Sequence, residues 1–120
     1  MDIVDQQLTG TKTIAVVGLS PRPDRDCYDV SKYLQGHGYK IIPVNPLVKE
    51  VLGEVSYPDL MAVPVRIDML DIFRLSSLVQ SVIDDAIAIG VKYVWMQDGV
   101  VNDEAAAKAE RHGIRVIMDN

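Results

Sequence analysis

Short β-branched runs alternate with amphipathic helical segments along most of this 120-residue chain. An alternation of this kind predicts right-handed βαβ crossovers and a parallel sheet. The predicted strands are 13–17, 40–44, 67–72, 93–96 and 115–118, with a further short strand near 55–57. The predicted helices are 26–37, a segment that begins at Ser76 or Ser77 and ends near 89, and a segment capped by Asn102 that ends near 112. We therefore expect an α/β fold, Rossmann-like and doubly wound, with a mostly parallel five- to six-stranded sheet and helices on both faces.

Glycine and proline set the ends of several of these elements. Gly38, Gly90 and Gly113 each follow a predicted helix, where a glycine favours termination. Pro43 lies inside a predicted strand although it cannot donate a ladder hydrogen bond, so we expect it near the end of the strand or beside a gap in pairing. The stretch 47–66 has no clear period and is expected to be irregular.

Length and composition predict one domain, with 1–12 as a polar lead-in and 13–120 as the folded unit. The formal net charge is -5, so the overall basic character of nucleic-acid-binding domains is missing and no nucleic-acid partner is expected. A single cysteine, Cys27, excludes an internal disulfide. The chain has no signal-like start and no apolar run of about 18 residues. We therefore expect a cytoplasmic protein without a membrane partner.

Open parallel sheets bind ligands beyond the carboxyl ends of their strands, and this rule selects a candidate site. The residues there are Gly18, Ser20, Pro21 and Arg22 after the first strand, Asn45 and Pro46 after the second, Phe73 and Arg74 after 67–72, and Gln97, Asp98 and Gly99 after 93–96. The loop 18–25 leads into a helix N-terminus, whose free N–H groups favour an anion. With Arg22 and Arg25, this loop suits a phosphate or pyrophosphate; the alternative is that the arginines only keep the loop solvated.

The usual dinucleotide-binding fingerprint is absent. Beyond Gly18 it needs one glycine where Ser20 stands and another at Arg22–Pro23, and an acidic residue for the ribose where Asn45 stands. A phosphate-binding Gly-Lys-Ser/Thr motif is also missing. The sequence thus favours a nucleotide ligand held by another variant of the loop.

At these residues the chain resembles the small stand-alone CoA-binding proteins of bacteria and archaea, relatives of the CoA-binding domain of the succinyl-CoA synthetase alpha subunit. The matching stretches, which together extend over 13–120, are GLSPRPDRDCYDVSKYL (18–34), GYKIIPVNP (38–46), GEVSYPDL (53–60), IDMLDIFR (67–74), WMQDGV (95–100) and RVIMDN (115–120). The resemblance implies a small-molecule nucleotide ligand, coenzyme A or an acyl-CoA.

The resemblance also implies roles for individual residues. Gly18, Ser20, Pro21 and Arg25 would cradle the pyrophosphate. Asn45 and Pro46, with Phe73 and Arg74, would line the adenosine side, and Gln97 and Gly99 would lie towards the pantetheine arm. Three places depart from the family pattern, namely Cys27 in place of serine, the segment 75–80 in place of a Glu and a Pro, and Asp98 in place of an apolar residue.

No nucleophile with an orienting base and no metal-ligand cluster emerges from the sequence, so we expect a binding protein that is not an enzyme by itself. We expect Asp84 and Asp85 to form a solvated helix face, and His37 and His112 to complement helix C-termini. Two other functions stay open, an NAD(P)-binding oxidoreductase fragment and a protein-interaction module that retains no nucleotide binding. Leu75, Leu78 and Met61 form either a homodimer contact or an edge of the core.

Overall fold

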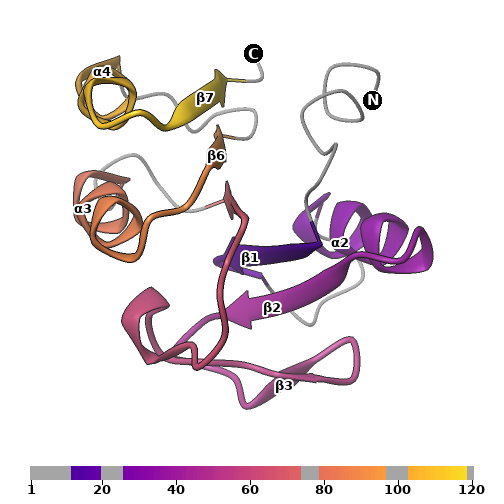
Figure 1. Ribbon diagram of the computed structural model, residues 1–120. Coiled ribbons are helices and arrows are strands. Elements are labelled where there is room, and N and C mark those ends of the chain that lie inside the picture. Colours follow the sequence, from indigo (N-terminus) through magenta and orange to yellow (C-terminus); the bar gives the residue numbers. More distant parts are fainter. Residues whose placement is uncertain (1–11, 20–25, 74–78, 97–102, 119–120) are drawn as a thin grey trace.

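The computed structural model describes residues 12–19, 26–73, 79–96 and 103–118. Its main sheet has five strands, all parallel, in the order β2-β1-β5-β6-β7 (Figure 1). These strands are β1 (Thr13–Val17), β2 (Lys40–Val44), β5 (Met69–Ile72), β6 (Tyr93–Met96) and β7 (Arg115–Met118). The chain order reverses between β1 and β5, which is the topological switch point of a doubly wound sheet. The predicted fold is confirmed.

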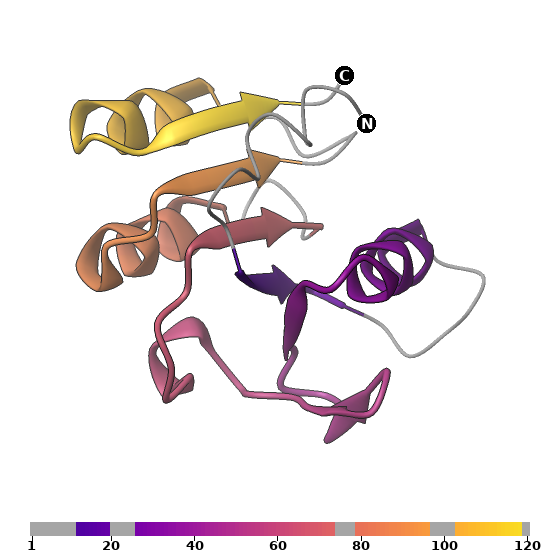
Figure 2. The ribbon, with the colours of Figure 1, turned by 45° about the vertical axis from the view of Figure 1, so that its right-hand side comes forward.

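Helices cover both faces of the sheet, as Figures 1 and 2 show. α2 (Asp26–Gly36) packs on one face, and α3 (Val79–Ile89) and α4 (Asp103–Arg111) pack on the other. The strands supply both cores by simple alternation. In β1, Ile14 belongs to the cluster beneath α2, whereas Ala15 belongs to the cluster beneath α3 and α4.

The predicted helix ends are also confirmed at three glycines. Gly38, Gly90 and Gly113 have φ values of 92, 77 and 82°, in the left-handed region that suits glycine after a helix. β5 begins at Met69, two residues later than predicted. The carboxylate of Asp68, just before it, accepts hydrogen bonds from the backbone of Lys12 and Thr13.

The stretch 47–66 is more ordered than the sequence suggested. It contains an antiparallel hairpin, β3 (Glu50–Val51) and β4 (Glu54–Val55), and then a 3₁₀ turn, η1 (Leu60–Ala62). Both turn residues of the hairpin, Leu52 and Gly53, have positive φ, which matches the twist of a two-residue hairpin. We expected an irregular stretch because 47–66 shows no clear period, and a turn with leucine at positive φ is not readily foreseen because leucine rarely takes this conformation.

Pro43 lies on β2, at one edge of the main sheet, and its carbonyl accepts the N–H of Tyr57 at 3.0 Å. The missing N–H therefore costs no bond to β1, as the sequence predicted. Tyr57 then accepts the N–H of Asn45 at 2.9 Å. These bonds tie the chain before η1 to the carboxyl end of β2, and so place η1 near the predicted ligand edge.

Candidate functional site

The carboxyl ends of β1, β2 and β5 meet at one edge. The N–H of Gly18 donates to Val44 at 2.9 Å, and the N–H of Phe73 donates to Val17 at 3.0 Å. Gly18 has a φ of 88°, a conformation that costs other residues strain energy, and it turns the chain out of β1. The structure thus brings Gly18, Asn45 and Phe73 to the same edge, as the strand-end rule predicted.

The structure describes only part of the predicted site. Gly18, Asn45, Pro46 and Phe73 fall within it, whereas Ser20, Pro21, Arg22, Arg25, Arg74, Gln97, Asp98 and Gly99 lie outside the described residues. The predicted helix caps Ser76, Ser77 and Asn102 also lie outside them. Of the apolar patch, Met61 is described and is 56% exposed, while Leu75 and Leu78 are not described.

Asn45 joins the loop after β1 to the turn after β2. Its Nδ2 donates to the carbonyl of Leu19 at 3.0 Å, and its Oδ1 accepts the N–H of Leu47 at 2.9 Å. The residue is 8% exposed. Its side chain therefore positions the edge through bonds within the protein, and a direct contact with a ligand stays a prediction.

Cys27 lies in the first turn of α2, beside the Gly18 turn. Its Sγ is 3.9 Å from the carbonyl oxygen of Gly18, to which it donates a weak hydrogen bond, and the residue is buried. This geometry agrees with a small side chain that packs α2 against the first loop.

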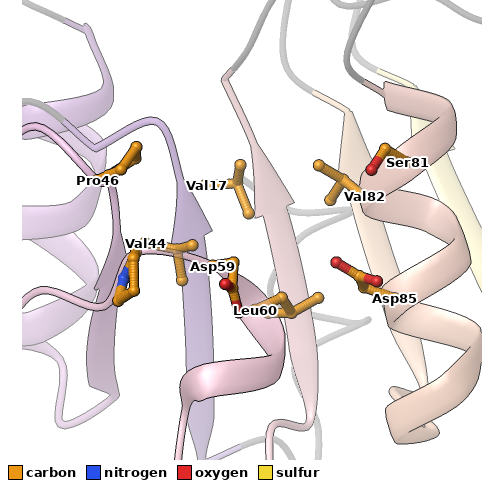
Figure 3. A pocket seen from close by; sticks show the side chains of 9 residues that line it. Val17, Val44, Pro46, Asp59, Leu60, Ser81, Val82 and Asp85 are labelled. Atoms are coloured by element: carbon orange, nitrogen blue, oxygen red, sulfur yellow. The ribbon is translucent and has the colours of Figure 1, made fainter.

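A cavity of about 190 Å³ opens at this edge between η1 and α3 (Figure 3). It is lined by Val17, Val44, Pro46, Pro58, Asp59, Leu60, Ser81, Val82 and Asp85. Only Pro46 among these was a predicted site residue. The strand ends could be predicted from the sequence pattern. The approach of η1 to α3 depends on tertiary packing, and no sequence pattern indicated it.

Two carboxylates lie at the cavity. Asp59 caps η1, where its Oδ1 accepts the N–H of Ala62 at 2.9 Å. Asp85 is half-buried on α3, and in Figure 3 its carboxylate is directed towards η1. Burial raises the pKa of Asp85 above its usual value, and the negative charges of Asp59 and Asp84 raise it further.

The expectation of a solvated Asp84–Asp85 face is confirmed for Asp84 and holds only in part for Asp85, which is half-buried. Asp84 is exposed and pairs with Lys108 of α4. Asp85 is one residue, about 100°, further around the helix and lies on the side of Ser81 and Val82, which line the cavity. Of these two neighbouring acidic residues, Asp84 therefore faces solvent and Asp85 lines the cavity.

Asp68, a second carboxyl group with a shifted pKa, lies away from this edge. Burial raises the pKa of Asp68, but the N–H groups of Lys12 and Thr13 and the charges of Arg66 and Lys92 outweigh it and hold the pKa below its usual value. Asp68 precedes β5 and so belongs to the opposite, amino edge of the sheet.

The two histidines lie at helix C-termini, as predicted, although each stands one residue past the end of α2 or α4. Nδ1 of His37 lies 2.9 Å from the carbonyl oxygen of Tyr33, and Nδ1 of His112 lies 2.9 Å from that of Lys108. Over the described ranges, no three His, Cys, Asp or Glu residues are grouped as metal ligands. None of the helices in the described part of the chain has the length and apolar content that a membrane span requires.

Comparisons with known proteins agree with this geometry. Residues 12–120 match the protein family described as "CoA binding domain". The YneT protein of Bacillus subtilis (strain 168) is 40% identical over 116 residues, which are 97% of this chain and 86% of YneT. Acetate–CoA ligase [ADP-forming] I of Archaeoglobus fulgidus is 25% identical over 96% of this chain, but the match spans only 18% of the ligase.

Solved structures show the same fold. A hypothetical protein from Pyrococcus horikoshii OT3 superposes with a TM-score of 0.93 at 39% identity, over 99% of this chain and 84% of the other. The dinucleotide-forming acetyl-coenzyme A synthetase 1 of Ca. Korarchaeum cryptofilum, in complex with phosphate and ADP, superposes with a TM-score of 0.78 at 30% identity. That match covers 91% of this chain and 26% of the synthetase.

Proposed function

This chain belongs to the family of CoA-binding domains, and from that premise we propose that it binds coenzyme A or an acyl-CoA at the carboxyl edge of its sheet. The observation that carries the proposal is the cavity of about 190 Å³ at the ends of β1 and β2, next to the Gly18 turn. Ligands of open parallel sheets occupy this position. The likeness to an ADP-forming acetate–CoA ligase supports an acyl-CoA as the natural form of the ligand.

The proposed role is binding without catalysis by this chain alone. The loop that follows Gly18 would hold the pyrophosphate, with Ser20, Pro21, Arg22 and Arg25 as its contacts. Pro46 and Phe73, with Arg74, would line the adenosine side, and Gln97 and Gly99 would lie along the pantetheine arm. Cytoplasm is the proposed compartment, because a single reduced cysteine fits it.

A selectivity titration tests this function against its alternatives. Calorimetry at one ionic strength would compare CoA, dephospho-CoA, NAD and NADP as ligands of the purified protein. We expect CoA to bind most tightly. A preference for NADP would instead identify an oxidoreductase fragment, and the absence of binding by all four would favour a protein-interaction module.

Replacement of Arg25 tests the phosphate contact. Arg25→Ala would lower the affinity for CoA, because a guanidinium bound to phosphate makes charge-assisted hydrogen bonds. Lys32→Ala is the matched control, since it removes a positive charge from the exposed surface of α2. Equal CoA affinity in wild type and Arg25→Ala would contradict the contact.

A further inference from the structure

The cavity between η1 and α3 has the size and walls of a site for a flat ring. Its walls include the apolar side chains of Val17, Val44, Leu60 and Val82. An apolar cavity of about 150 Å³ holds a benzene molecule, so a cavity of about 190 Å³ suits one aromatic heterocycle. The adenine base is the only aromatic part of coenzyme A.

The charges at the cavity also favour the adenine end of coenzyme A. Among the described residues, its polar side chains are Ser81 and the carboxylates Asp59 and Asp85, and none of the nine that line it is basic (Figure 3). Ionised carboxylates only accept hydrogen bonds and repel phosphate groups. The cavity therefore disfavours the phosphates of CoA and favours a neutral group that carries N–H donors.

We infer that this cavity takes the adenine ring of the ligand and that Asp85 selects adenine by accepting a hydrogen bond from its 6-amino group. The inference rests on the proposed function and adds a residue and a base preference to it. Asp85 is the carboxylate that fits this role, because the Asp59 carboxylate is already engaged in capping η1. Carboxylates recognise exocyclic amino groups of bases in this way.

Desolvation of Asp85 also favours a hydrogen bond from the ligand to this carboxylate. Burial and the charges of Asp59 and Asp84 oppose ionisation of this carboxyl group. A hydrogen-bond donor that covers the carboxylate would offset part of that cost, since a buried charge without donors is unfavourable. The free protein thus holds an acceptor in the cavity that gains from a ligand N–H.

The position of the cavity along the sheet edge agrees with a ligand whose adenine end lies at β2. It lies at the ends of β1 and β2, whereas the β6 end is two strands beyond β1, roughly 10 Å away at the usual strand spacing. A ligand that extends from the cavity past the Gly18 turn would place its adenine at β2 and its other end towards β6.

The test compares two ligands that differ only at the amino group. Adenosine 3′,5′-bisphosphate is the nucleotide end of CoA, and purine riboside 3′,5′-bisphosphate lacks only the 6-amino group. Wild type should bind the adenine ligand about tenfold more tightly, the usual effect of one hydrogen bond to a charged group. Asp85→Ala should bring the ratio of the two dissociation constants close to one.

Asp84→Ala is the matched control. It removes the same charge from the neighbouring position of α3, where the side chain pairs with Lys108 and does not line the cavity. This variant should keep the wild-type ratio, and circular dichroism would check that both variants fold. Equal binding of the two ligands by wild type, or a full preference in Asp85→Ala, would overturn the inference while CoA binding stands. Absence of CoA binding by wild type would overturn the proposed function as well.

Discussion

Asn45 and Leu19 are joined by a buried hydrogen bond, in which the side-chain amide of Asn45 donates to the backbone carbonyl of Leu19 at 3.0 Å. The bond crosses from the turn after β2 to the loop after β1. It therefore fixes the distance between two segments that both border the proposed ligand site.

Replacing Asn45 by alanine tests this connection. The change leaves the Leu19 carbonyl and the Leu47 N–H without their partner, and the free energy of unfolding should fall by about 1–3 kcal/mol. CoA affinity should fall as well. Urea unfolding and calorimetry measure the two effects.

Gln35→Ala provides the control, because Gln35 Nε2 also donates to a backbone carbonyl, that of Leu52, at 3.0 Å. This variant should lose stability and keep its CoA affinity under folding conditions. An unchanged CoA affinity in Asn45→Ala would show that the connection does not matter for binding.

Gly18→Ala should destabilise the protein by about 1–2 kcal/mol, because its φ of 88° is strained for a residue with a Cβ atom. Gly36→Ala is the contrast: Gly36 ends α2 and an added Cβ would meet nothing within 4 Å. That variant should gain up to about 1 kcal/mol. Thermal unfolding of the two variants would measure both effects. Equal changes in stability would contradict the requirement for glycine at position 18.

Asp68→Asn should lower stability by about 1–2 kcal/mol at neutral pH, because the carboxylate accepts two backbone N–H bonds. Its pKa in the folded protein lies below the reference value of 3.8. Its contribution is therefore complete above pH 3.8 and is lost as the pH falls through the lower folded value. Urea unfolding over an acidic pH series should show the two proteins converge, and a constant difference would contradict this assignment.

Asp85→Asn should change stability in the opposite direction from Asp68→Asn. The pKa of Asp85 is raised above 3.8 in the folded state, so ionisation at neutral pH disfavours folding. The variant should be more stable than wild type at neutral pH, by less than about 1 kcal/mol because the carboxyl is partly exposed. The gain should disappear as the pH falls below 3.8.

Within the described part of the chain, the charged groups that act on Asp85 are Asp59 from η1 and Asp84 from its own helix, with Lys108 of α4 paired to Asp84. All of them remain in the variant. A loss of stability in Asp85→Asn at neutral pH would show that the carboxylate has a favourable partner instead.

The strands and the ligand edge were predictable because they depend on local pattern. Short β-branched apolar runs and the glycines at helix ends located β1, β2, β6 and β7 to the residue. The rule for open parallel sheets then brought Gly18, Asn45 and Phe73 together without knowledge of any contact. These features follow from residues that are close in sequence.

The cavity was not predictable, because it depends on contacts between residues that are far apart in the sequence. Asp59 and Asp85 are 26 positions apart, and they meet only because Tyr57 bonds to the end of β2 and carries η1 towards α3. Helical period places Asp85 on a side of α3, but it does not reveal which segment packs there. Of the hairpin 50–55 only a short strand near 55–57 was predicted, and β4 lies at Glu54–Val55. Its partner β3 was missed because the turn places a leucine at positive φ.

Titration of ¹⁵N-labelled protein with CoA, followed by NMR, would show whether CoA binds at the carboxyl edge of the sheet. We expect saturable shifts of the amides of Gly18, Asn45 and Val82 around the ligand edge, while those of Asp68 and Lys92 at the opposite edge stay in place. Shifts confined to that opposite edge, or no shifts at a saturating CoA concentration, would contradict binding at the carboxyl edge.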